Sequence, residues 1–145
     1  MISFRLFYYI TILFLFTQMA FSNTFSLTEN GDDTWNVNYI SDTNIAGFQF
    51  NVDGVVVVNS AYGGDAEANG FMISTNPSGT VLGFSLTGAT IPEGDGVLVY
   101  VSITSDAMSD GCVSIASPVF SDASGSGLDV EAGDEYCVGE PPPPT

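Results

Sequence analysis

The sequence predicts an all-β protein, a two-layered sandwich of short strands with at most one short helical turn. Three observations lead to this fold class. Apolar and polar side chains alternate in short runs, Gly, Asn and Asp punctuate these runs at regular spacing, and no segment keeps a helical periodicity for about ten residues. Many short strands separated by frequent turns are typical of a β-sandwich.

The predicted strands follow one another along the chain. In Thr34–Ile40 aromatic and aliphatic side chains alternate with asparagines, as in a strand that is buried on one side. Ile45–Val52 repeats this alternation with phenylalanines, and Val55–Val58 is apolar throughout, so we expect it to be buried on both faces. Asp65–Asn69 is the predicted helical turn. The remaining predicted strands are Thr80–Thr87, Val97–Thr104, Cys112–Ala116, Val119–Phe120 and Leu128–Val130.

The two ends of the chain differ from this central part. Residues 1–22 have the features of a secretory signal peptide, with a positive start at Arg5, an apolar run and small residues before Asn23. We expect cleavage there, which leaves a β-sandwich domain over residues 23–139 that is secreted to the extracellular space or the cell surface. An uncleaved membrane anchor is the alternative, although the apolar run is short for a membrane span. Residues 140–145 contain four prolines and form an expected linker or truncated tail.

The charge of the chain excludes most kinds of catalysis. It has 17 acidic side chains, one basic side chain (Arg5) and no histidine. Imidazole acid–base catalysis, lysine nucleophiles and histidine-ligated metals therefore lack their residues, and phosphate backbones would be repelled, so we predict no nucleic-acid partner. A pair of carboxylates of glycosidase type is the one mechanism that the composition permits, but no glutamate lies in a motif. The sequence therefore predicts a protein without enzymatic activity.

Cys112 and Cys137 are the two cysteines of the chain. In an exported protein they predict a disulfide that ties the later strands to the end of the domain. Two free buried thiols are the alternative. A zinc site is disfavoured, because two sulfur atoms without histidine do not complete the four ligands of a structural zinc ion.

Calcium is the one cofactor for which the sequence offers candidate ligands. Oxygen-bearing side chains alternate at Asp122, Ser124 and Ser126, as at the start of a calcium loop. The second acid and the glutamate that complete such a loop are missing, and a tight turn between two strands is the alternative interpretation. A second group of acids that strand ends can bring together consists of Asp32 and Asp33 with Asp53, or with Asp134 and Glu135.

The order of the segments resembles that of a cohesin domain, a sandwich module of cellulosome scaffolds. Three stretches carry the resemblance: Ser41–Val52 with its Gly-x-x-Phe-x-Val run, Thr80–Leu86 followed by the turn and strand of Pro92–Ile103, and Val119–Val130, which is similar to the closing hairpin. The resemblance covers about residues 25–138. It implies a jelly-roll sandwich of about nine strands that binds dockerin modules through one sheet face. The chain departs from the family in its short hairpin tip and its cysteine pair.

These observations predict an exported, non-catalytic, cohesin-like module for attachment or scaffolding, whose partner is a dockerin-like or cell-surface protein. A carbohydrate-binding module for neutral polysaccharide is the alternative, and a structural component of an extracellular or virion surface assembly is the second alternative. We assign Trp35 to the core in preference to a sugar-stacking strip. The side chains that we expect to face a ligand are Asn36, Asn38, Gln49, Asn51, Tyr62, Ser85 and Thr87.

Overall fold

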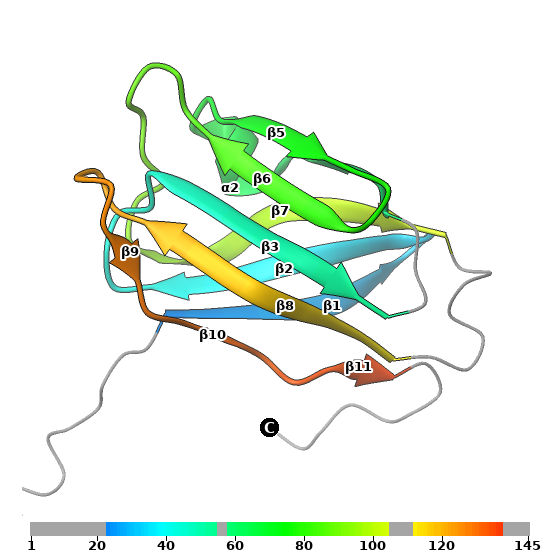
Figure 1. The fold of residues 1–145 in the computed structure, drawn as a ribbon. Helices are drawn as coiled ribbons and strands as arrows, with labels where there is room; N and C mark the ends of the chain where they lie inside the picture. The colour runs from blue at the N-terminus through cyan, green and yellow to red at the C-terminus, as the bar shows by residue number, and fades with distance from the viewer. Residues whose placement is uncertain (1–22, 55–57, 105–111, 138–145) are drawn as a thin grey trace, which may run out of the picture.

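The computed structural model describes residues 23–54, 58–104 and 112–137 (Figure 1). They form two β-sheets packed face to face, which confirms the predicted all-β sandwich. The expected signal peptide, the proline-rich tail and most of the predicted strand Val55–Val58 lie outside the described residues. No helix of the described ranges has the length and apolar character that crossing a membrane requires.

One sheet, here called the β2 sheet, has the strand order β10-β1-β2-β7-β4. Its strands are β1 (Asn23–Gly31), β2 (Thr34–Ser41), β4 (Val58–Tyr62), β7 (Gly94–Ile103) and β10 (Val130–Ala132). The other, the β3 sheet, has the order β11-β8-β3-β6-β5, with β9 paired to β8. Its strands are β3 (Gly47–Asp53), β5 (Met72–Thr75), β6 (Thr80–Phe84), β8 (Cys112–Ser121), β9 (Gly127–Leu128) and β11 (Tyr136–Cys137). The short helix α2 (Gly64–Ala68) lies between β4 and β5, one residue from its predicted position.

The structure contains strands that we did not predict. The strand β1 begins the described chain and buries Phe25 and Leu27 against the other sheet, while β5 and β11 are short edge strands. The predicted strands Cys112–Ala116 and Val119–Phe120 are one strand, β8. A bulge opposite β3 absorbs the intervening residues, where Ser117 has a positive φ of 49°.

The core between the sheets is rich in phenylalanine. Phe25 of the β2 sheet contacts Phe120 and Phe50 of the β3 sheet, with ring centroids 4.2 Å and 5.4 Å apart. Phe48 continues this cluster and stacks against Phe71, which follows α2. Phe25 comes from one sheet, and Phe48, Phe50 and Phe120 come from the other, so their burial holds the two layers together.

Trp35 and the disulfide lie at the part of the core that is next to β11. Trp35 is 2% exposed, and Tyr136 contacts its ring edge-on with centroids 4.8 Å apart, which confirms the assignment of Trp35 to the core. The hydroxyl of Tyr136 donates a hydrogen bond to Glu29 on β1. The predicted disulfide between Cys112 and Cys137 is present and joins β8 to β11. It fixes the final described strand to the sheet.

Candidate functional site

Exposed apolar side chains gather on the outer face of the β3 sheet. Met72, Leu82 and Val119 are 51%, 38% and 49% exposed, and Phe84 on the same face is partly buried. We call these four residues the apolar patch. Exposed apolar groups of this size on neighbouring strands of one sheet are a feature of interaction surfaces.

The register of the sheet brings the apolar patch together from three strands. Leu82 on β6 is paired with Gln49 on β3, which is paired with Val119 on β8. Met72 on β5 is paired with Phe84 in the next row along β6. Neighbouring strands lie about 4.8 Å apart, so Leu82 and Val119 are separated by about 10 Å across the face.

The local sequence of β6 explains why its apolar residues point outward. Val81 and Gly83 face the core, and the ring of Phe48 packs against Gly83, where any Cβ atom would overlap it. Side chains alternate between the faces of a strand, so Leu82 and Phe84 must face solvent. Near its end, β6 therefore has Val81 and Gly83 on its inner face and the apolar Leu82 and Phe84 on its outer face.

The predicted ligand-facing residues divide between two opposite faces of the sandwich. Gln49 and Asn51 lie beside the apolar patch on β3, whereas Asn36 and Asn38 lie on β2 in the other sheet. Asn36 and Asn51 each keep a buried side-chain oxygen for which the described residues provide no hydrogen-bond partner. Tyr62, on β4, is 45% exposed as expected. The seven residues therefore do not make a single surface.

Ser85 and Thr87 lie in a turn, and the predicted strand Thr80–Thr87 ends earlier, at Phe84. The hydroxyl oxygen of Ser85 accepts hydrogen bonds from the backbone N–H groups of Thr87 and Ala89. Serine competes with sheet pairing in this way because its side chain reaches nearby backbone donors. Leu82 and Phe84 face outward on β6, so alternation would turn Ser85 and Thr87 inward. The expectation that alternation points both outward therefore had the opposite phase, and the strand ends before them.

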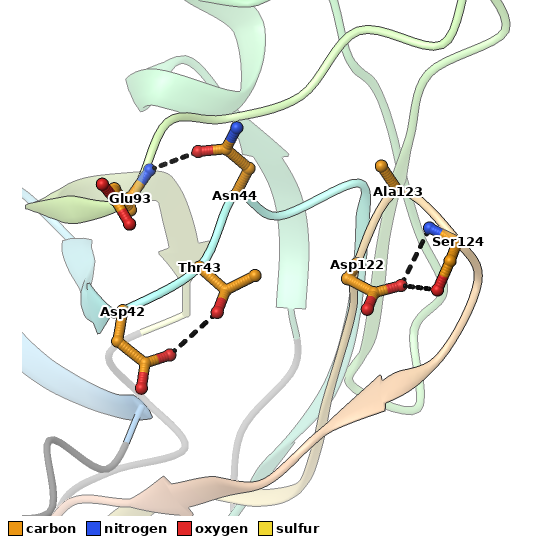
Figure 2. Close-up of a pocket in the computed structure, with 7 residues that line it drawn as sticks. All are labelled: Asp42, Thr43, Asn44, Glu93, Asp122, Ala123 and Ser124. Carbon is orange, nitrogen blue, oxygen red and sulfur yellow. Dashed lines mark hydrogen bonds between the residues drawn. The ribbon is translucent and has the colours of Figure 1, made fainter.

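An acidic pocket of about 440 Å³ lies at the end of the sandwich where β3 begins and β8 ends (Figure 2). Three loops contribute to it, and Asn44 joins two of them by accepting a hydrogen bond from the backbone N–H of Glu93 at 3.0 Å. Nothing in the sequence indicated this grouping, because its members are far apart in the chain. The lining residues are Asp42, Thr43, Asn44, Glu93, Asp122, Ala123 and Ser124.

The predicted calcium ligands form a hydrogen-bonded turn, of which Asp122 and Ser124 line this pocket. One carboxylate oxygen of Asp122 accepts bonds from the hydroxyl of Ser124 at 2.6 Å and from the backbone N–H groups of Ser124 and Ser126. The Ser124 hydroxyl and the Ser126 backbone N–H hold the pKa of Asp122 below its usual value. The tight-turn interpretation therefore describes the geometry, and calcium binding here stays a prediction.

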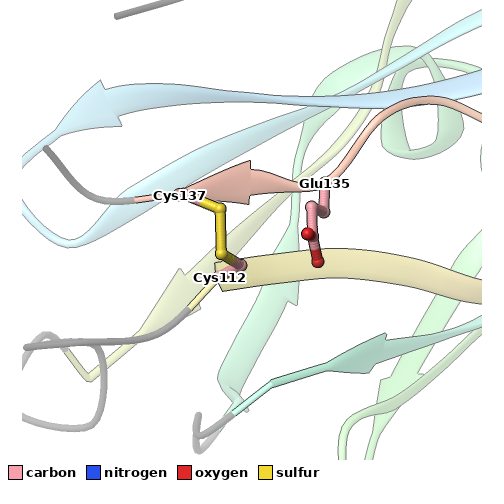
Figure 3. A group of neighbouring side chains, drawn as sticks. All are labelled: Cys112, Glu135 and Cys137. Atoms are coloured by element: carbon pink, nitrogen blue, oxygen red, sulfur yellow. A yellow bond between two sulfur atoms is a disulfide. The ribbon is translucent and has the colours of Figure 1, made fainter. Parts of the chain in front are cut away.

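The acids of the second predicted group do not form a metal site among the described residues. Within the described ranges, none of Asp32, Asp33, Asp53 and Asp134 belongs to a group of three possible metal ligands. Glu135 does lie within 4.8 Å of both cysteine sulfurs (Figure 3). Those sulfurs are joined in the disulfide, so they offer no thiolate to a metal ion.

Tyr39 and Asp65 form a polar contact between β2 and α2. The phenol of Tyr39 donates a hydrogen bond of 2.8 Å to Asp65, and burial, followed by this bond, raises the pKa of Tyr39 above its ordinary value. Because the folded-state pKa is raised, the bond contributes fully below the unfolded value of about 10 and is lost as the pH rises further. We expect Tyr39→Phe to lower the free energy of unfolding by about 1 kcal/mol at pH 7.

The pH dependence distinguishes this contact from ordinary packing. Urea titrations at pH 8 and above pH 10 measure the free energy of unfolding of wild type and of Tyr39→Phe. The difference between the two proteins should be smaller above pH 10 than at pH 8. Tyr62→Phe, at an exposed tyrosine, is the control and should change stability little at either pH. An advantage that is the same at both pH values would contradict this account.

Comparison with known proteins identifies the fold. No protein-family model and no curated protein sequence match the chain. Solved structures match it over most of its length, and one is a non-cellulosomal cohesin from the archaeon Archaeoglobus fulgidus, with a TM-score of 0.54 and 16% identity over 75% of this chain and 84% of that one.

Two cohesins solved in complexes with dockerins are also similar. The sixth cohesin of scaffoldin B from Acetivibrio cellulolyticus, in complex with a Cel5 dockerin, has a TM-score of 0.52 and 24% identity over 77% of this chain and 96% of that one. The Coh-OlpC–Doc435 complex from Clostridium thermocellum has a TM-score of 0.55 and 15% identity over 77% of this chain and 90% of that one. With its two sheets, its phenylalanine core and these similarities, the chain has a cohesin-like fold.

Proposed function

We propose that this chain is an exported, non-catalytic module that binds a protein partner through the outer face of the β3 sheet. The observation that carries the proposal is the apolar patch, whose side chains come from β5, β6 and β8 and share one face. Cohesin-like structures that were solved with dockerins support a protein as the partner.

The outer face of the β2 sheet is less suited to a protein partner. Its large exposed apolar side chains are Ile40 and Tyr62, which lie on β2 and β4 with β7 between them. The apolar patch has four members instead of two, and three of them (Met72, Leu82 and Phe84) lie on the directly paired strands β5 and β6. Val119 lies across the polar Gln49 from Leu82. Apolar side chains with polar neighbours are the composition that protein interfaces favour.

The acidic pocket indicates the charge of the partner. It lies near the apolar patch, because Asp122 directly follows β8 and the Asp42–Asn44 segment lies between the end of β2 and the start of β3. The carboxylates of Asp42, Glu93 and Asp122 have no cationic side chain in the described part of the chain to neutralise them. A partner with apolar side chains at its centre and Lys or Arg at its rim matches this arrangement.

The same pocket supports a non-catalytic role. A glycosidase acid needs a raised pKa, so that it carries a proton at neutral pH. The pKa of Asp122 is instead lowered by hydrogen bonds from Ser124 and Ser126. The carboxylate is therefore ionised at neutral pH and suited to attract cations.

Site-specific photo-crosslinking tests the docking face. A benzoyl-phenylalanine at position 82 or 119 should form an adduct with one discrete partner among the extracellular proteins of the source organism. The same group at position 40, on the opposite face, should not. Once mass spectrometry has identified that partner, Val119→Asp should weaken its binding in calorimetry by about 2 kcal/mol or more, since a charge is placed in the centre of the interface.

Ile40→Asp is the matched control. Ile40 and Val119 are both β-branched, both lie on strands and are both 49% exposed, but they are on opposite sheets. The control should leave the affinity unchanged. Equal losses from the two variants, or adducts from both faces, would show that the β3 sheet is not the docking face.

A further inference from the structure

The outer face of the β2 sheet carries a second, chemically different surface. Inward-facing Trp35, Val37 and Tyr39 are buried, so the residues that alternate with them on β2 face outward. Pairing with β1, β7 and β4 extends this surface across four strands. Figure 1 shows β1, β2 and β7 of this sheet. Eight of its outward positions are polar and uncharged: Thr28, Thr34, Asn36, Asn38, Ser60, Tyr62, Tyr100 and Ser102. Ile40, Asp95 and Val97 also face outward at one end.

Most of this surface is uncharged, although the protein is strongly acidic. The chain has 17 Asp and Glu residues, yet these eight outward positions hold hydroxyl, amide and phenol groups. Asn38 donates a hydrogen bond to the hydroxyl of Thr28 across the β1–β2 pair. This bond fixes the orientation of the two side chains on the surface. Acids occur at its margins, with Asp95 at the start of β7 and Glu131 on the edge strand β10.

Tyr62 and Tyr100 provide an aromatic contact area at one side of this surface. They are paired across β4 and β7, with ring centroids 5.8 Å apart and planes inclined by 37°. The ring of Tyr100 packs against Gly63, where a Cβ atom would lie 2.7 Å from the ring, and this contact supports Tyr100 from below. Tyr62 is 45% exposed, so part of its side chain is accessible to a ligand.

A hollow of about 440 Å³ lies on the same face, toward β1. Ser26, Asn38 and Ile40 line it from β1 and β2, and Asp95 and Val97 line it from β7. Tyr62 lies on β4 and Tyr100 on β7, and the hollow extends to β1, which is three strands from β4 in the sheet order. At about 4.8 Å for each strand, the whole surface extends about 14 Å across the sheet.

We infer that this surface binds a neutral oligosaccharide chain. The exposed Tyr62 ring offers an apolar surface to the C–H groups of a sugar ring, while its hydroxyl can form hydrogen bonds. Tyrosine combines these two properties at many binding interfaces. Amide and hydroxyl groups exchange hydrogen bonds with sugar hydroxyls, and Asp95 accepts them in the hollow. Acidic sugars are repelled by a protein with a formal charge of −16. This site is independent of the protein-docking face on the other sheet.

Affinity electrophoresis of the full chain tests the inference. Native gels would contain soluble β-glucan, xyloglucan or galactomannan as neutral probes, and polygalacturonate as the acidic probe. We expect at least one neutral polysaccharide to retard the protein and polygalacturonate to leave it unretarded. Tyr62→Ala should lower the association constant about fivefold, whereas Tyr62→Phe, which keeps the ring, should retain most of it.

Controls separate this site from the docking face. Val119→Asp, on the β3 sheet, should leave the retardation unchanged while it weakens protein docking. An unchanged thermal unfolding midpoint shows that Tyr62→Ala folds. Absence of retardation by all three neutral polysaccharides would overturn the inference. Retardation that survives Tyr62→Ala, or that is equal with polygalacturonate, would overturn it as well.

Discussion

Phe120→Ala is expected to lower the free energy of unfolding by about 3–5 kcal/mol. Phe120 is fully buried on β8, and its ring lies 4.2 Å from that of Phe25 on the opposite sheet. Truncation removes the apolar contact between the layers and leaves a cavity that the paired strands cannot close. Urea denaturation followed by tryptophan fluorescence measures the loss, because Trp35 lies in the same core.

Phe84→Ala is the control for this experiment. It removes the same side chain from β6, but on the outer face of the β3 sheet, where Phe84 is partly exposed. Its loss should be about 1 kcal/mol, since less apolar surface is returned to water and no cavity forms. If the two variants were equally destabilised, the core would not lie where the structure places it.

Loss of the disulfide is expected to cost about 3 kcal/mol. Cys112 and Cys137 are 25 residues apart, and the bond between them restricts the unfolded chain as well as holding β11 on β8. The change is Cys112→Ser together with Cys137→Ser, so that no free thiol remains. Chemical denaturation of the variant and of the oxidised wild type measures the difference.

Reduction provides an independent measure of the same bond. Wild type treated with a thiol reductant should unfold at the lower denaturant concentration of the double variant, and the double variant should be insensitive to the reductant. A wild type whose stability is unaffected by reduction would mean that the bond contributes nothing to the folded state. The apolar patch lies on β5, β6 and the other end of β8, so partner binding should survive in the folded double variant.

Local alternation predicted much of the fold correctly. The strand β2 and the inward direction of Trp35 follow from a period of two, which depends only on neighbouring residues. The helical turn α2 followed from its composition, and the disulfide followed from the count of two cysteines. The continuity of β8 was not predicted, because Pro118 within it is a usual sign of a strand end and a bulge accommodates it here.

The candidate sites required the tertiary structure. Alternation shows that Asn36 and Gln49 point away from the core, but not that they lie on opposite sheets, because sheet membership depends on pairing between distant strands. The apolar patch exists because β6 lies between β3 and β5 in one register, and the acidic pocket exists because three loops meet at one end of the sandwich. The sequence by itself determined a sandwich of strands with an acidic composition, since these depend on composition and short-range pattern, and it favoured the disulfide that the structure contains. Only the tertiary structure decided which exposed side chains share a face, since long-range strand pairing sets that arrangement.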